Sequence, residues 1–479
     1  MYFNSLTFIF IFLPAVLAGY YGIGKRSTAG ARLWLTGASF FFIGEANARV
    51  LLLLVLSMAV NYVLSLFFQK PWKRAAFVPA VFFNIGLLLY FKYTDFFLAN
   101  CNSAFGTNVP LLHLALPLGI SFYTFTLLSY DVETYRGTLG RLSLPDYCLY
   151  VSYFPKFTQG PIMRPGDFAA ELDRNRRIRW DYDAFVRGAQ MFACGLCKKV
   201  LLADTFAKPV DYYFQYYKNC TTLDLAIATL AYTFQIYFDF SGYCDMASGI
   251  SEMLGFRLPV NFNSPYRAWS VTEFWKRWHI TLTDFLREYV YFPLGGSRRG
   301  RIRTCVNILI VFLVSGFWHG ANWTFLYWGM MHGVLMVFER LFRRPLSYIP
   351  KAVRWFPTFA FINLGWLCFR SESVAQFEYI NTQWGYLNMA LNRDLVEGMR
   401  IPGLRAVLQL AGIPYSDLAV YKLSTLLWFA AAFFVCLCLP NNQKRRYQTT
   451  RASLALTAAM LIVSVISLGS VSAFIYSNF

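Results

Sequence analysis

The sequence carries little charge for its length. Asp, Glu, Lys and Arg make up 14% of the 479 residues and hydrophobic residues 57%, whereas a soluble domain carries about 25% charged residues. Seven long runs contain no charged residue. Residues 304–338 are treated separately below, and each of the other six is near or above the roughly 17 to 25 residues that cross a bilayer as a helix: 1–24, 51–69, 75–91, 109–130, 423–443 and 452–479. These features exclude a soluble cytosolic enzyme and predict an all-α, multi-pass membrane protein.

Acidic residues are scarcer than basic ones. Asp and Glu number 25 against 44 Lys and Arg, a net charge of +19, which in a soluble protein would suggest a nucleic-acid partner. Here the basic residues gather in short patches beside the apolar runs, for example at 25–26, 70–74 and 343–344, as in cytoplasmic loops of membrane proteins. We therefore expect membrane lipid and no nucleic acid as a partner, and a location in the inner (cytoplasmic) membrane of the cell.

The alternation of apolar runs and basic patches predicts roughly eleven or twelve transmembrane helices, with the N-terminus outside. We expect one membrane domain, 1–479, in three parts: N-terminal spans in 1–238, a motif-bearing core in 239–341, and C-terminal spans in 342–479 with an outer loop at 371–420. A weaker span near 188–203 precedes a clearer one at 225–238. Lys198 and Lys199, near the outer end of the weaker span, do not fit this topology.

Histidine is rare, with four in the chain. His319 and His332 lie in Thr304–Phe338, 35 residues without a charge, too long for one span and barely enough for two. This stretch must therefore turn within or near the bilayer, and the small residues around His319 favour a tight turn there. We expect a catalytic role for His319 and a packing role for His113; both roles remain open for His332.

Several catalytic signatures are absent. The sequence contains neither a G-x-S-x-G elbow nor a Walker loop. No Cys or carboxylate at metal-ligand spacing accompanies His319 or His332, so we expect no metal and no tightly bound cofactor. A buried imidazole stays neutral, because burial disfavours its charged form, and remains available as a base. It suits the deprotonation of a hydroxyl that attacks a thioester.

The segment 239–303 is too polar to span a membrane and too aromatic for a solvated loop, which predicts that it lies on or partly in the membrane. Ser270 and Glu273 form a capping box that starts a helix. Apolar residues then recur at helical spacing on one face, with charged residues opposite. His279 lies at the boundary, and the apolar face comprises Val271, Phe274, Trp275, Trp278, Leu282, Phe285, Leu286 and Tyr289.

Five motifs in order resemble the membrane-bound O-acyltransferases, closest to the bacterial alginate O-acetyltransferase branch: Tyr237–Tyr243 (YFDFSGY), Asn261–Tyr266 (NFNSPY), Phe274–Ile280 (FWKRWHI), Tyr291–Gly296 (YFPLGG) and Phe317–Gly320 (FWHG). The resemblance implies transmembrane and amphipathic or re-entrant helices around a central catalytic funnel. It also implies an O-acetyltransferase that draws on cytoplasmic acetyl-CoA. The acceptor would be a hydroxyl of an extracytoplasmic polysaccharide, alginate-like or peptidoglycan, reached directly or through a periplasmic or extracellular acetyl-handling protein. His319 matches the family's invariant histidine, and His279 the second catalytic position.

Further residues of the motif region are assigned to the two substrates. We expect substrate binding by Asp239, Ser241, Tyr243, Arg277 and Trp318. The first three follow a span, so they either orient an imidazole or cap the helix end. The phosphates of coenzyme A favour arginine, so a basic cluster is assigned to the donor entrance, with plain positive-inside topology as the alternative: Arg298, Arg299, Arg301 and Arg303.

Two other functions compete with polysaccharide acetylation. D-alanyl transfer to teichoic acid, by a member of the same family, would take its acyl group from a carrier protein. A polysaccharide or lipid transporter would explain the many helices and the intramembrane histidines. It would not explain the amphipathic central segment or the five ordered motifs.

Overall fold

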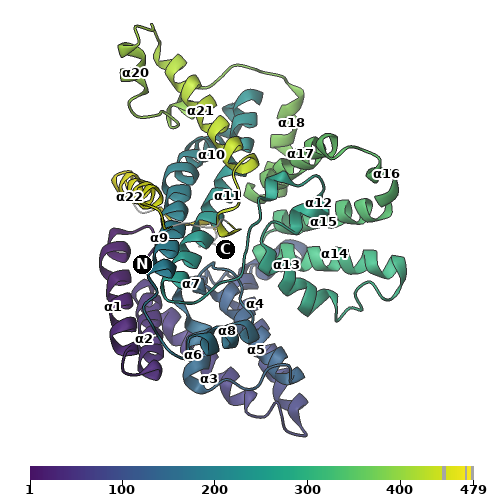
Figure 1. Ribbon diagram of the computed structural model, residues 1–479. Coiled ribbons are helices and arrows are strands. Elements are labelled where there is room, and N and C mark those ends of the chain that lie inside the picture. The colour runs from purple at the N-terminus through teal and green to yellow at the C-terminus, as the bar shows by residue number, and fades with distance from the viewer. Residues whose placement is uncertain (445–448, 470–471, 476–479) are drawn as a thin grey trace. The chain divides into compact units, whose positions relative to one another are not determined.

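The computed structural model describes residues 1–444, 449–469 and 472–475, and within these ranges every regular element is a helix (Figure 1). This confirms the all-α prediction. The chain separates into two compact units. The first comprises 1–196, 243–260 and 446–479, and the second comprises 197–242 and 261–445.

The first unit contains the N-terminal helices and the last helix. Ser27 caps α2 by accepting a hydrogen bond from the Gly30 N–H at 3.0 Å, and α1 and α2 pack side by side. The helices are α1 (Leu13–Gly24, after the π-helical turn Phe8–Phe12), α2 (Thr28–Ala46), α3 (Ala48–Ser65), α4 (Lys73–Phe105), α5 (Ile120–Arg136), α6 (Leu144–Ser152), α7 (Phe154–Phe157), α8 (Pro165–Arg174), α9 (Tyr182–Cys197) and α22 (Arg451–Ile466).

The second unit holds most of the motif region. A π-helical turn, Lys198–Ala203, continues α9 into α10. The helices are α10 (Asp204–Tyr216), α12 (Val271–Trp275), α13 (Ile280–Leu286, followed by the π-helical turn Arg287–Tyr291), α14 (Gly300–His319), α15 (Trp323–Leu341), α16 (Arg343–Ser347), α17 (Lys351–Arg370), α18 (Val374–Thr382), α19 (Arg393–Glu397), α20 (Leu404–Leu410) and α21 (Asp417–Leu437). The helix α11 (Thr222–Met253) belongs to this unit up to Gly242 and to the first unit beyond it.

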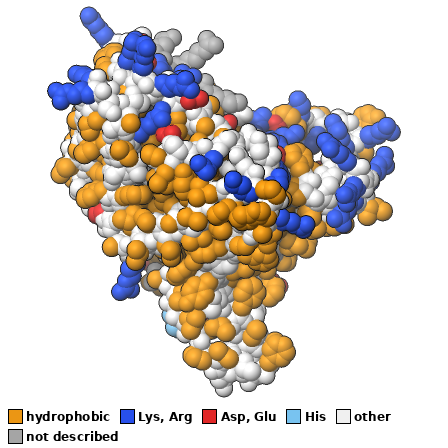
Figure 2. Space-filling view, turned by 90° about the horizontal axis from the view of Figure 1, so that it is seen from below, with side chains coloured by type: hydrophobic (Ala, Val, Ile, Leu, Met, Phe, Trp, Pro, Cys, Tyr) orange, Lys and Arg blue, Asp and Glu red, His pale blue; other side chains and the backbone are white. Residues whose placement is uncertain are grey.

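Four helices in the described ranges are long and apolar enough to cross a membrane: α3, α4, α14 and α21. The segment Phe8–Gly24 and α22 are shorter apolar helices. Large side chains on these helices are open to the surroundings, with Leu52 70%, Phe82 73% and Leu426 67% exposed. Figure 2 shows a face on which hydrophobic side chains cover a wide area. Such a surface suits contact with lipid, whereas the count of eleven or twelve spans stays a prediction.

The apolar run 109–130 is helical only in its second half. The helix α5 begins at Ile120, after Pro117 and after Gly119, whose φ of 75° lies in the left-handed region. Proline lacks the N–H that a helix interior requires, and a left-handed glycine breaks the helical path. The charge-free pattern therefore located an apolar segment correctly and missed the start of its helix.

The helix α11 extends well beyond Phe238, where the clearer of the two spans at 188–203 and 225–238 was expected to end. It continues to Met253, and its second half is buried almost throughout. Asp239 thus lies in the middle of a helix, and the expectation that it might cap a helix end is wrong. A helix buried on all sides tolerates a carboxylate only when a partner compensates its charge, and Asp239 has such a partner, described below.

The expected amphipathic helix is two short helices. Ser270 caps α12 as predicted, because its hydroxyl accepts a hydrogen bond from the Glu273 N–H at 3.0 Å. The helix then ends at Trp275, and α13 begins at Ile280. His279, between them, has a φ of 44°, which interrupts a helix and is uncommon for any residue except glycine. The prediction of one continuous helix is therefore wrong.

The apolar face of this segment is covered by protein. Trp275 packs edge-on against Trp328, with ring centroids 5.6 Å apart, and Trp278 packs against Trp366 at 4.7 Å. Both indole side chains are buried. The need of this face for an apolar contact is therefore met by α15 and α17, whereas the placement of the segment on or partly in the membrane stays a prediction.

Candidate active site

The uncharged stretch 304–338 folds as the predicted hairpin. The helix α14 ends at His319, the chain turns through Gly320 to Asn322, and α15 returns beside it (Figure 1). The side chain of Asn322 caps α15 by accepting a hydrogen bond from the Thr324 N–H at 3.1 Å. His319 is therefore the last residue of a helix, at a tight turn.

Two glycines bring the helices of this hairpin into close contact. A Cβ atom on Gly316 would collide with the carbonyl oxygen of Phe325, and one on Gly329 with that of Phe312. Small residues allow this approach of two backbones, as they do in other membrane helix pairs. The turn that carries His319 is thus fixed by backbone packing one helical turn away.

The His319 side chain lies in an aromatic enclosure. Its ring is 3% exposed and packs edge-on against Trp318, Trp328 and Phe369, with centroid distances of 4.9, 5.2 and 5.2 Å. These rings exclude bulk water from the imidazole. Exclusion of water strengthens electrostatic interactions and protects a reactive acyl group from hydrolysis.

His279 is also buried, and it is held by Asn261. The Nδ1 atom lies 3.2 Å from Oδ1 of Asn261, and the ring meets Phe240 of α11 edge-on at 4.8 Å. Its Nε2 atom has no hydrogen-bond partner among the described residues. His279 lies outside the four candidate spanning helices, and burial lowers its pKa to about 3, so its ring is neutral at physiological pH.

Trp318 contacts both histidines. Its ring lies 4.9 Å from that of His319 and 6.3 Å from that of His279. The structure therefore gathers three of the residues expected at the active site into one buried cluster within the second unit. The two histidines are 40 positions apart in the sequence, and nothing in this spacing requires that both contact Trp318.

Asp239 forms an ion pair instead of facing an open site. Lys199 Nζ lies 2.8 Å from Asp239 Oδ1 and 3.0 Å from Asp204 Oδ1. Asp239 and Lys199 are both buried. Lys199 did not fit the topology predicted from the sequence, and its ion pair with Asp239 was not predicted. The neighbouring Ser241 is buried, and its hydroxyl has no hydrogen-bond partner in the described part of the chain.

Arg277 is also held by an acidic neighbour. Its Nη2 and Nε atoms lie 2.6 and 2.9 Å from Oε1 of Glu273, and its Nη1 donates to the carbonyl oxygen of Asn263 at 3.3 Å. The guanidinium thereby ties α12 to the chain segment after Asn261. Its assignment to substrate binding stays a prediction.

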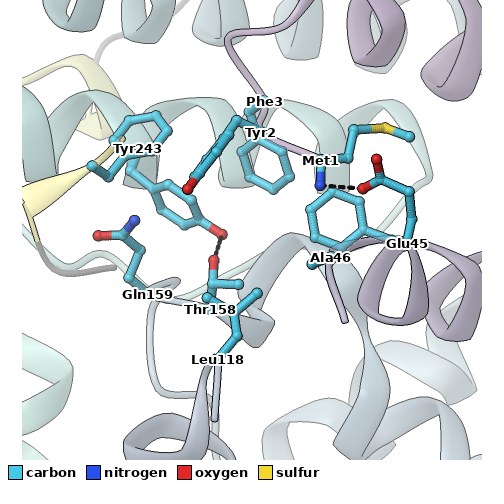
Figure 3. Close-up of a pocket in the computed structure, with 11 residues that line it drawn as sticks. Met1, Tyr2, Phe3, Glu45, Ala46, Leu118, Thr158, Gln159 and Tyr243 are labelled. Carbon is cyan, nitrogen blue, oxygen red and sulfur yellow. Dashed lines mark hydrogen bonds and ion pairs between the residues drawn. The ribbon is translucent and has the colours of Figure 1, made fainter. Parts of the chain in front are cut away.

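Tyr243 lies in the first unit. Its hydroxyl and that of Thr158 are 2.6 Å apart, and both residues line a cavity of about 300 Å³ together with Gln159 and Glu45 (Figure 3). Figure 3 shows the two hydroxyls pointing toward each other. Aromatic and polar side chains both line this cavity, so a role in substrate binding stays open for Tyr243.

The four arginines assigned to the donor entrance lie around the first residues of α14. All four side chains are exposed: Arg298, Arg299, Arg301 and Arg303. His319 ends the same helix, and a helix of 20 residues is about 30 Å long. The cluster and His319 therefore occupy opposite ends of α14.

The His332 side chain is buried. Its Nδ1 accepts a hydrogen bond from the Trp275 indole N–H at 3.2 Å, and a Cβ atom on Gly365 would lie 2.9 Å from its Nε2. These contacts favour the packing role for His332, which stays a prediction. The residues that sequence reasoning missed are Asn261 and Lys199. Asn261 begins one of the five motifs, which was the available signal for it.

The fold is that of a helical membrane protein, and its second unit holds two buried histidines whose rings contact Trp318. A model of the membrane-bound O-acyltransferase family matches residues 103–374. The chain is 34% identical to a peptidoglycan O-acetyltransferase of Helicobacter pylori, over 100% of this chain and 97% of the relative. It therefore belongs to the membrane-bound O-acyltransferase family and is an O-acyltransferase.

Two further relatives differ in how much of the chain they match. A probable alginate O-acetylase, AlgI, of Pseudomonas aeruginosa is 37% identical over 81% of this chain and 77% of its own length. A teichoic acid D-alanyltransferase of Streptococcus thermophilus is 28% identical over 49% of this chain and 59% of its own length. The similarity to the two acetylating relatives thus extends over far more of the chain.

Proposed function

We propose that this protein transfers acetyl groups from cytoplasmic acetyl-CoA, across the inner membrane, to hydroxyls of an extracytoplasmic polysaccharide. The observation that carries the proposal is the burial of His279 and His319, whose rings both contact Trp318. A water-excluding site with neutral imidazoles suits acyl transfer from a thioester to a hydroxyl. The relatives named for peptidoglycan and alginate acetylation support this choice of acyl group and acceptor.

In the proposed reaction, the acceptor oxygen attacks the thioester carbonyl carbon. His319 accepts the hydroxyl proton as the C–O bond forms. The C–S bond then breaks, and the thiolate of coenzyme A leaves and takes up the proton. A positioned base of this kind contributes about 10²- to 10⁴-fold in rate.

The donor would enter beside Arg298, Arg299, Arg301 and Arg303. Their exposed guanidinium groups match the phosphates of coenzyme A. The acceptor would be reached on the other side, directly or through a periplasmic or extracellular partner protein. The segment 371–420, assigned to that side, offers exposed apolar side chains for such a partner, among them Tyr386, Leu387 and Leu410.

The experiment that tests the proposal uses the purified full chain in lipid nanodiscs. Acetyl-CoA labelled in the acetyl group is supplied with a soluble polysaccharide acceptor, and free thiol and labelled polymer are measured. We expect both products with the wild type and neither above background with His319→Ala. A parallel reaction offers a D-alanyl-loaded carrier protein instead. Transfer of D-alanine alone, or no reaction at all, would overturn the proposal in favour of teichoic acid modification or transport.

A further inference from the structure

We infer that Asn261 is a positioning residue that fixes the tautomer of His279, so that the Nε2 lone pair of this histidine accepts a hydrogen bond from an acceptor hydroxyl other than the one whose proton passes to His319. The inference rests on the proposed function and adds to it the role of the second histidine. It starts from three contacts to a single atom, Oδ1 of Asn261.

The first step identifies that atom as an oxygen. The backbone N–H of Thr281 points to it at 3.3 Å, and the Thr281 hydroxyl donates to it at 2.9 Å. A backbone N–H can only donate, so the side-chain atom that it meets must be the carbonyl oxygen and not the amide nitrogen. The Asn261 backbone is held as well, because its carbonyl oxygen accepts the Ile280 N–H at 2.9 Å.

The second step assigns the proton on His279. Its Nδ1 lies 3.2 Å from the same oxygen. A carbonyl oxygen only accepts hydrogen bonds, so Nδ1 must carry the hydrogen. In a neutral imidazole the other nitrogen, Nε2, then carries a lone pair and no hydrogen. Burial of the ring keeps it neutral.

The third step concerns what Nε2 can do. It is buried and has no hydrogen-bond partner in the described ranges, so its lone pair is available to a bound molecule. A lone pair accepts a hydrogen from a hydroxyl. It cannot donate one to the oxygen of a thioester carbonyl. His279 therefore orients the acceptor through a hydroxyl that does not react, and it does not polarise the thioester carbonyl.

The backbone conformation of His279 supports a functional role for this residue. His279 has a φ of 44°, a conformation that costs free energy in any residue with a side chain. The residues that hold the ring come from three parts of the second unit: Asn261 before α12, Phe240 of α11, and Trp318 of α14. A strained residue held from three sides is typical of a site where orientation matters.

The first test reads the tautomer directly in the wild-type protein. The chain has four histidines, so labelling with ¹⁵N-histidine gives few signals, and the His279→Gln variant assigns the pair from His279. We expect a protonated Nδ1 and a non-protonated Nε2. A neutral ring with its proton on Nε2, or a ring protonated at both nitrogens at pH 7.5, would overturn the inference. Neither result would contradict the proposed function.

The second test separates positioning from folding. Asn261→Leu should lower kcat about 10- to 100-fold, as loss of an orienting partner does for other histidines, with little change in the KM for acetyl-CoA. In the His279→Gln background the same change should cost less than about twofold, because the two residues act as one unit. Equal losses in both backgrounds would assign Asn261 a purely structural role and overturn the inference.

The matched control is Asn263→Leu. Asn263 lies two residues away in the same segment, and the hydrogen bonds recorded for it use its backbone atoms. We expect its kcat to stay within about twofold of the wild type, well short of the loss at an orienting residue. A loss equal to that of Asn261→Leu would show that the segment, and not the contact to His279, is responsible. If the wild type itself transfers no acetyl group, the proposed function fails instead, while the tautomer measurement still stands.

Discussion

Lys199 Nζ lies 2.8 Å from Asp239 Oδ1, and both side chains are buried. The pair joins the π-helical turn after α9 to the middle of α11, one residue before Phe240, which packs on His279. A buried charge without its partner costs far more than the pair gains. The ion pair therefore fixes the position of the helix that supports one of the two histidines.

This relationship predicts the effect of breaking the pair. Lys199→Met leaves Asp239 buried without a cation and should lower the free energy of unfolding by about 3–5 kcal/mol, seen as a lower midpoint of thermal unfolding in detergent. The double variant Lys199→Met with Asp239→Leu should recover most of the loss, because Asp204 is 29% exposed at its side chain and tolerates losing its partner. A double variant as unstable as the single one would contradict this account.

The close packing of α14 and α15 gives a second prediction. A methyl group in Gly316→Ala would collide with the Phe325 backbone, so the hairpin must open, at a cost of about 1–3 kcal/mol. Because His319 follows three residues later, acetyl transfer should fall together with the midpoint of thermal unfolding. The control is Gly86→Ala in α4, where an added Cβ has no neighbour within 4 Å; because alanine favours a helix more than glycine does, it should lower neither measurement.

The features that local sequence determines could be predicted. A charge-free stretch too long for one helix indicated the hairpin, and small residues indicated the turn at His319. The Ser270 cap followed from a four-residue pattern. Each of these depends on neighbours within a few positions, which a single sequence displays.

The features that depend on residues distant in the sequence could not be predicted. Lys199 and Asp239 are 40 positions apart, and Asn261 and His279 are 18 apart. Contacts with residues distant in the sequence, such as Asn261, hold the break between α12 and α13 at His279. Helical periodicity did not indicate this break. The helical spacing of apolar residues also predicted the aromatic face of α12, but it did not indicate whether protein or lipid covers that face.

The arginine cluster gives a third prediction. Changing Arg298, Arg299, Arg301 and Arg303 together to Gln should raise the KM for acetyl-CoA more than it lowers kcat, since the exposed cluster lies about 30 Å along α14 from His319. Steady-state kinetics with varied acetyl-CoA measure this. The control replaces Arg343 and Arg344, which are also exposed, and should leave the KM unchanged. If protease mapping finds the same orientation and the KM is unaltered, the cluster serves membrane topology alone.

The last prediction concerns His319 and its comparison with His332. His319→Gln keeps hydrogen-bonding capacity but cannot accept a proton at neutral pH. A general base lost in this way should cost about 10²- to 10⁴-fold in transfer, measured as labelled acetyl on the polysaccharide. The fold should persist, because the glutamine side chain can keep apolar contact with Trp318, Trp328 and Phe369, which enclose the ring at the end of α14.

His332→Gln should behave in the opposite way. The carboxamide oxygen can still accept the Trp275 indole hydrogen bond, but the flat ring packed beside Gly365 is lost, so stability should fall while most of the transfer activity remains. The two variants carry the same chemical change at two buried histidines of one hairpin, so a difference in activity between them isolates proton acceptance from burial. If His319→Gln keeps more than about a tenth of wild-type transfer, well short of the loss expected for a base, then His319 is not the base, and His279, with its unprotonated Nε2, takes its place.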